Sequence, residues 1–370
     1  MARRLVAALV IVGMGSWGCG RAPVEPSAPE GKDFEVKGSG SERGGGLFGF
    51  GGTPSRSTED SAVGVSGSAS SGSGTGSGTV PAGVLTAGVW DDNLNFGLFK
   101  AYRDGLTQKL ADFTPAEQDA AAAVVRSPKA SLDVALVIDT TGSMGDEITY
   151  LQAEFTAISE AVQVQFPGVP QRWAVIAYRD TTDTYVIKGA DFGTSVGWFQ
   201  TQLNALSASG GGDFPEAPDQ ALAYASQLSW NPDPDAAHLA FWVADAPPHD
   251  DKAAPFSAAV RALATAGVHV YPVASSGIDE ATEYAMRATA QLTQGRYVFL
   301  TDDSGVGGSH KEPSIPCYAV THLDRAIVRA VGSELAGSAL DVDPTDLVRT
   351  VGDPENGTCT LSSGAVAQMF

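Results

Sequence analysis

Short apolar runs alternate with amphipathic segments through the middle of the chain. Leu132 to Ile138 is an apolar run of strand length, rich in Val and Ile and interrupted only by Asp133, the pattern of a strand buried on both faces of a parallel sheet. The following segment, 146–166, places apolar residues at three-to-four spacing and predicts a helix. Because this alternation continues to residue 335, we predict an α/β fold with a doubly wound, mostly parallel six-stranded sheet flanked by helices.

The remaining predicted elements follow the same reading. Further strands are expected at 173–178, 184–187 (an antiparallel edge), 238–244, 268–274 and 296–300. Further helices are expected at 198–206, 219–228, 256–266, 279–293 and 319–335. Ahead of the first strand, aromatic residues at helical spacing predict a helix at 96–110, and a second helix is predicted at 115–125.

Composition shifts divide the chain into five predicted parts. They are a signal peptide at 1–18, a Gly/Ser/Pro-rich flexible linker at 19–83, an N-terminal helical extension packed on the main domain at 84–128, the main domain at 129–337, and a C-terminal extension at 338–370. The linker composition cannot support a packed core, so we expect it to act as a disordered tether.

The N-terminus has the pattern of an export signal. Arg3 and Arg4 precede the apolar segment 5–15, which is too short to span a bilayer. The next residues, Ser-Trp-Gly-Cys, resemble a bacterial lipoprotein cleavage box and predict lipidation of Cys19; ordinary cleavage nearby is the alternative. We therefore expect an exported lipoprotein anchored in the membrane. If the cell has two membranes, Gly20 in place of Asp after the cysteine favours the outer one, by analogy with other lipoproteins.

Net charge restricts the classes of binding partner, and the cysteine count indicates a disulfide. The chain has 43 acidic and 23 basic residues and a formal charge of −20, which argues against nucleic acid and against electrostatic binding to anionic membranes. Membrane contact is then expected through the lipid anchor only. Of the three cysteines, lipidation of Cys19 leaves Cys317 and Cys359 as an even pair, and a disulfide between them would attach the C-terminal tail to the domain.

Three oxygen-bearing side chains follow the first predicted strand at alternate positions. Asp139, Thr141 and Ser143 stand at the carboxyl end of a parallel strand, where open α/β sheets place ligands, and Gly142 lets the chain turn. One carboxylate and two hydroxyls can supply half the shell of a hard divalent cation. The alternative is a strand-to-turn junction in which Asp139 caps the next helix.

The string Asp-Thr-Thr-Gly-Ser-Met at 139–144 resembles the metal-ion-dependent adhesion motif, D-x-[ST]-G-S-M, of von Willebrand factor type A domains. The resemblance extends over residues 130–337 and implies a divalent cation, Mg²⁺ or Ca²⁺ with Mn²⁺ as an alternative, held by loops at one sheet edge. It implies Asp245, which follows a central strand, as a further ligand. The second loop, Gly-Gly-Gly-Asp-Phe-Pro-Glu at 210–216, departs from the integrin-like Thr pattern and resembles a bacterial subgroup, in which Asp213 would be the ligand. A turn-forming role for Asp213 is the alternative.

These observations predict an envelope-tethered, divalent-metal-dependent protein-binding module rather than an enzyme. The expected partner is a protein, with an acidic residue that completes the metal shell. One alternative is a structural envelope protein whose metal only stabilises the fold. The other is a hydrolase using Ser143, His249 and Asp245, which is disfavoured because no nucleophile elbow occurs at a strand-to-helix turn.

Overall fold

A computed structural model describes residues 31–39, 81–123 and 126–370. The predicted signal peptide, the lipidation site Cys19 and most of the predicted linker lie outside these residues. Within the described residues, every helix is too short or too polar to span a bilayer.

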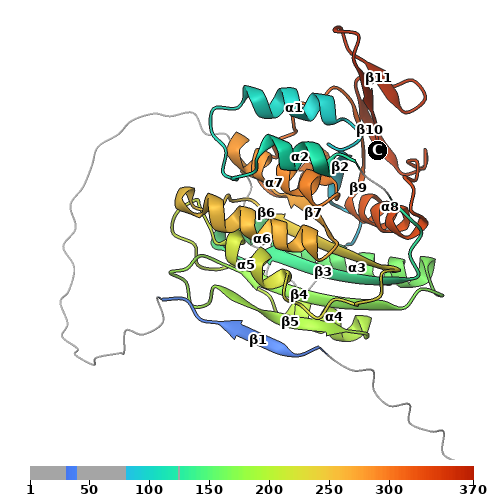
Figure 1. The fold of residues 1–370 in the computed structure, drawn as a ribbon. Coiled ribbons are helices and arrows are strands. Elements are labelled where there is room, and N and C mark those ends of the chain that lie inside the picture. Colours follow the sequence, from blue (N-terminus) through green and yellow to red (C-terminus); the bar gives the residue numbers. More distant parts are fainter. Residues whose placement is uncertain (1–30, 40–80, 124–125) are drawn as a thin grey trace, which may run out of the picture.

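A ten-stranded sheet forms the centre of the molecule, in the order β1-β5-β4-β3-β6-β7-β8-β2-β9-β10 (Figure 1). Five neighbouring strands run parallel: β4 (Gln171–Tyr178), β3 (Ser131–Asp139), β6 (Ala236–Ala244), β7 (Val268–Ala274) and β8 (Tyr297–Thr301). The outer strands pair antiparallel with their neighbours: β1 (Asp33–Val36), β5 (Ile187–Gly193), β2 (Thr86–Trp90), β9 (Tyr318–His322) and β10 (Leu347–Val351). The predicted α/β fold with a helix-flanked sheet is confirmed, although the sheet is mixed and larger than six strands.

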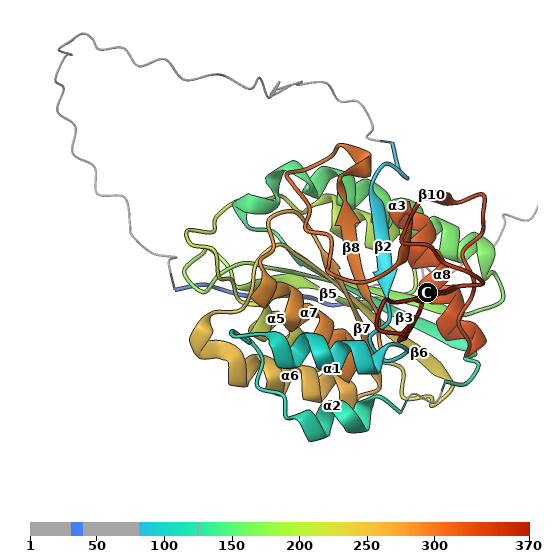
Figure 2. The ribbon, with the colours of Figure 1, turned by 90° about the horizontal axis from the view of Figure 1, so that it is seen from above.

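Helices cover both faces of this sheet, as Figures 1 and 2 show. One face packs against α1 (Phe96–Gly105), α5 (Pro218–Ala225), α6 (Ala253–Thr265) and α7 (Glu280–Leu292), and α2 (Pro115–Ala121) packs on α7. The other packs against α3 (Ile148–Gln165), α4 (Val196–Asn204) and α8 (Leu323–Ala336). Within β3, Ala135 and Val137 belong to the first core, whereas Val134 and Leu136 belong to the second, so the strand is buried on both sides as its sequence predicts.

Several strands lie where the sequence predicted none. β2 lies in the range predicted as a helical extension, yet all its residues are buried and it fills the position between β8 and β9. β1 lies in the predicted linker, and β10 lies in the predicted C-terminal extension. The predicted helix at 319–335 begins as β9, and the predicted strand at 184–187 is replaced by β5 from residue 187. These short strands are stabilised by partners distant in sequence, which local patterns do not report.

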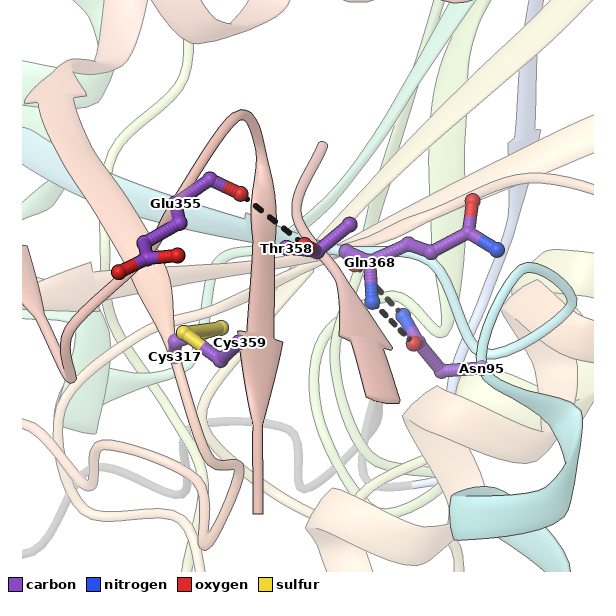
Figure 3. The surroundings of a disulfide bond; sticks show 6 residues. All are labelled: Asn95, Cys317, Glu355, Thr358, Cys359 and Gln368. Atoms are coloured by element: carbon purple, nitrogen blue, oxygen red, sulfur yellow. Dashed lines mark hydrogen bonds between the residues drawn. A yellow bond between two sulfur atoms is a disulfide. The ribbon is translucent and has the colours of Figure 1, made fainter. Parts of the chain in front are cut away.

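The C-terminal residues are attached to the domain by a disulfide and by hydrogen bonds (Figure 3). Cys317, which precedes β9, is bonded to Cys359 in β11 (Thr358–Thr360), with their Cα atoms 6.3 Å apart. β11 pairs with β12 (Val366–Gln368). The Gln368 amide donates to Asn95 Oδ1 at 2.7 Å, and Asn95 Nδ2 donates to the Gln368 carbonyl at 2.8 Å. The tail is therefore fixed both to β9 and to the start of α1.

Candidate metal centre

Two aspartates meet at the carboxyl edge of the parallel strands. Asp139 is the last residue of β3, and Asp245 follows β6 directly. Because β3 and β6 are parallel neighbours in register, their carboxyl ends lie side by side. Asp139 is fully buried and Asp245 is 5% exposed. The structure therefore brings these two predicted residues to one place.

The turn after β3 holds one oxygen of Asp139 and leaves the other free. Asp139 Oδ1 accepts hydrogen bonds from the Thr141 amide at 2.8 Å and from the Thr141 hydroxyl at 2.7 Å. The Thr141 hydroxyl lies 3.2 Å from that of Ser143, which is in the short 3₁₀ helix Gly142–Asp146. Asp139 Oδ2 and Asp245 Oδ1 are buried and have no hydrogen-bond partner among the described residues. An unpaired buried carboxylate oxygen is costly, so this arrangement suits a cation from outside the chain.

The pKa values of these carboxyls also show that burial makes their ionised forms unfavourable. Burial, followed by the negative charge of Asp245, raises the pKa of Asp139 to about 7. Burial also raises the pKa of Asp245, against a lowering contribution from the Ser143 hydroxyl. Both shifts mean that the ionised forms are unfavourable in this pocket unless positive charge is added.

In the Gly-rich loop, Glu216 is buried beside the site whereas Asp213 is exposed. Asp213 is exposed and, among the described residues, makes no hydrogen bond to Asp139 or Asp245. Glu216 is 2% exposed, and its Oε2 has no partner in the described chain. Burial, then the charges of Asp139 and other nearby aspartates including Asp245, raise the pKa of Glu216 to about 9. The ligand role of Asp213 stays a prediction, since this side chain is exposed.

Backbone contacts explain why Glu216 faces the site. Its amide donates to the Pro247 carbonyl at 2.9 Å, which places it beside the loop after Asp245. A Cβ atom at Gly211 would lie 3.1 Å from Glu216 Oε1 and 3.3 Å from Thr141 Cβ, so the glutamate and the motif threonine flank the same point. Gly211 has a φ of 71°, a conformation that glycine adopts without strain. A glutamate shortly before a helix resembles an ordinary first-turn acid, so its sequence position alone did not reveal this role.

The donor set fits a hard divalent cation with two direct carboxylates. Among the described residues, no three Asp, Glu, His or Cys side chains are grouped so that they could hold one metal ion. Asp139 and Asp245 with the hydroxyls of Thr141 and Ser143 form an all-oxygen set of the kind that Mg²⁺ and Ca²⁺ prefer. The two unpartnered carboxylate oxygens are the observation that favours a cation over a simple helix cap.

His249 has a partner of its own. Its Nε2 lies 2.7 Å from Asp180 Oδ1, and within the described chain it has no hydrogen bond to Ser143. Asp180 follows β4 and belongs to the turn next to the Gly-rich loop. The Asp183 carboxylate accepts the Gly211 amide at 3.0 Å, so this turn also holds the loop in place.

Comparison with known proteins assigns a family to the central part of the chain. Residues 133–307 match the family described as the von Willebrand factor A domain. These residues form a von Willebrand factor A domain. A "putative ariadne-like RING finger protein" of Acanthamoeba polyphaga mimivirus is 33% identical over 122 residues, which are 33% of this chain but only 12% of that protein.

One solved structure is also similar to this chain. It is the crystal structure of the conserved hypothetical protein BatB from Bacteroides thetaiotaomicron. The two chains are 12% identical with a TM-score of 0.40, and the match covers 55% of this chain and 98% of that one.

Proposed function

We propose that this protein is a divalent-metal-dependent protein-binding module, tethered to a bacterial envelope through lipidated Cys19. Von Willebrand factor A domains commonly mediate protein interactions, which supports the binding class. The observation that carries the metal dependence is the pair of buried carboxylate oxygens, on Asp139 and Asp245, that have no partner in the described chain. We propose Mg²⁺ or Ca²⁺ as the ion, with Mn²⁺ as a substitute.

Charge indicates what such an ion could recruit. Asp139, Thr141, Ser143 and Asp245 would hold the cation, which when bound supplies an electrophilic coordination position. Two ionised aspartates and one divalent cation sum to zero, so a carboxylate from a partner protein could complete the shell. Glu216 changes this balance only if it ionises, and its pKa of about 9 without metal favours the neutral form at pH 7. A partner acid is therefore compatible with the site.

A binding role is favoured over hydrolysis by the position of His249. A Ser-His-Asp mechanism needs the histidine within reach of the serine, but His249 is hydrogen-bonded to Asp180 instead. We therefore propose that the protein is not a hydrolase.

The test compares melting temperatures of the full chain in EDTA and with Mg²⁺, Ca²⁺ or Mn²⁺. An ion at a hundredfold its dissociation constant should stabilise the wild type by about 2.7 kcal/mol, and Asp139→Asn should abolish this increase. Asp341→Asn, which changes an exposed aspartate in the C-terminal residues, is the matched control and should keep the increase. Equal melting temperatures with and without metal in the wild type would contradict the proposal.

Acetate then serves as the simplest model of a partner carboxylate. In the presence of Mg²⁺, acetate should raise the melting temperature further in the wild type than chloride at equal ionic strength. Stabilisation by metal without any response to acetate would favour the alternative in which the ion only supports the fold.

A further inference from the structure

Residues 31–39, which we call the strap, bind the outer edge of the sheet as a separate segment. The strap is described on its own, between residues 1–30 and 40–80, which the structure does not describe. Its strand β1 pairs antiparallel with β5, from Asp33 opposite Ala190 to Val36 opposite Ile187. The blue strand in Figure 1 therefore lies along the sheet like a bound peptide.

The ends of the strap fit closely against the domain. A Cβ atom at Gly31 would overlap the carbonyl oxygen of Asp191, and one at Gly38 would overlap the carbonyl oxygen of Asp183. Only glycine permits such a close backbone approach at both ends. Between them, the Phe34 ring packs on Tyr224 with centroids 4.3 Å apart. The contact is thus specific in register, not a loose adhesion of linker to surface.

The strap is nevertheless weakly buried. Of the four β1 residues only Phe34 is partly buried, and Val36 is 40% exposed. Beyond the ladder, the Asp191 amide donates to the Lys32 carbonyl at 3.0 Å, and the Val186 amide donates to the Val36 carbonyl at 2.9 Å. A short edge strand with little buried apolar area belongs to the least stable units of a fold, which open without global unfolding.

One end of the strap touches the turn that supports the candidate metal centre. The Ser39 amide donates to the Thr181 carbonyl at 2.9 Å, and its hydroxyl donates to the same oxygen at 3.1 Å. Two residues further on, the Asp183 carboxylate holds the Gly211 amide of the Gly-rich loop. A continuous series of contacts therefore connects the strap to the loop that presents Glu216.

We propose that the outer edge of β5 is a peptide-binding site, and that its occupant, the strap, detaches and rebinds while the domain stays folded. Detachment exposes the edge of β5 and removes the support that residues 38 and 39 give to the turn at 181–183. The binding site itself is independent of the metal and of the anchor.

A change of reach follows, and this consequence rests on the proposed anchor at Cys19. With the strap bound, about 12 residue steps separate Cys19 from the domain, which allows at most about 40 Å of extended chain. With the strap detached, about 65 steps separate Cys19 from residue 84, which allows at most about 220 Å. The strap thus sets the distance at which a membrane-anchored domain can search for a partner.

The test measures hydrogen exchange in the full chain, with Cys19→Ser to prevent lipidation and with EDTA to exclude metal. The amides of Val186 and Asp191 donate to the strap, so they report its docking directly. In the double variant Gly31→Val/Gly38→Val, whose changes lie in the strap and not in the core, both amides should exchange at least tenfold faster. In the wild type they should still exchange faster than the amides of β3, which open only on global unfolding.

A synthetic peptide of residues 30–40, at a millimolar concentration comparable to that of a tethered segment, should restore slow exchange in the double variant. The same peptide with Phe34→Asp should not. Equal exchange at Val186 and Asp191 in wild type and double variant would show that the strap does not dock. Wild-type exchange as slow as that of β3, or no rescue by the peptide, would overturn the proposal of a detachable strap. None of these outcomes depends on the metal test.

Discussion

Carboxylates are buried at both ends of the parallel strands, but they differ in whether a basic side chain pairs with them. At the amino ends, Asp92 accepts two hydrogen bonds from the Arg287 guanidinium, at 3.0 Å and 2.8 Å, and both side chains are almost completely buried. At the carboxyl ends, Asp139 and Asp245 are similarly buried, yet no lysine or arginine of the described chain forms an ion pair with them.

Other buried acids at the amino ends are also paired with arginines. Arg296 binds Asp91 at 3.0 Å, Arg287 also binds Glu283 at 3.1 Å, and Glu334 forms an ion pair with Arg126. For each of these acids at the amino ends the chain supplies its own cation. Asp139 and Asp245 have no such partner among the described residues, which is the difference that the proposed external cation would remove.

The largest expected change in the free energy of unfolding is at the amino ends, where arginines pair with the buried acids. Arg287→Met leaves Asp92 without a cation and leaves Glu283 with Lys311 alone, and this should lower the free energy of unfolding by about 3–5 kcal/mol. Urea denaturation of the full chain in EDTA measures it. Arg325→Met, at an exposed pair with Asp324, should change it by less than about 0.5 kcal/mol. If Arg287→Met lowered the free energy of unfolding by less than about 1 kcal/mol, the buried acids at the amino ends would not depend on their arginine partners.

The second effect has the opposite sign. Asp139→Asn keeps an oxygen for the Thr141 donors but removes the buried charge, so in EDTA at pH 8 it should raise the free energy of unfolding by about 1–3 kcal/mol. Asp92→Asn, the matching change at the other end, should lower it. Destabilisation by both substitutions would mean that the Asp139 carboxylate has a structural partner after all.

The pH dependence of stability should reveal the cost of ionising Asp139. The folded-state pKa of Asp139 is raised to about 7, so its protonated form is favoured by folding. This contribution is fully present below the unfolded pKa of about 3.9 and is lost as pH rises through about 7. In EDTA, the free energy of unfolding should therefore fall by about 2–3 kcal/mol more between pH 5 and pH 8 in the wild type than in Asp139→Asn. Parallel pH profiles for the two proteins would contradict this assignment.

The smallest effect concerns Glu216. With a pKa of about 9, it is already neutral at pH 7 in the absence of metal, so Glu216→Gln should change the free energy of unfolding in EDTA by less than about 0.5 kcal/mol. Chemical denaturation at pH 7 checks this. A gain above 1 kcal/mol would show that Glu216 is ionised and adds a third negative charge to the site.

Sequence patterns predicted the elements whose signals are local. The β3 run is apolar on both faces apart from Asp133, and Asp139 ends the strand as its sequence predicts. β2 was missed because Thr86–Trp90 is a short run containing a glycine. Gly88 lies against the Phe299 ring, a reason for glycine that appears only after pairing with β8.

The site shows the same limit. Asp213 stands next to glycines and resembles a loop ligand, whereas Glu216 precedes a helix and resembles a capping acid. What distinguishes them is burial: the Pro247 carbonyl holds the Glu216 amide, while Asp213 remains in solvent. That contact joins two loops about 30 residues apart, so no local pattern carries it.

The direction of the strap has a mechanical consequence. Residue 39 lies near the proposed partner-binding edge, whereas residue 31, where an anchored chain would pull, is at the other end of the antiparallel pairing. Tension between a bound partner and the membrane would then run along β1 and not across it. Because hydrogen bonds between antiparallel strands are perpendicular to the strands, such a pull loads all of them at once in shear. Without an applied force, the strap would detach by thermal opening. Under tension between the anchor and a bound partner, its hydrogen bonds with β5 would resist detachment together.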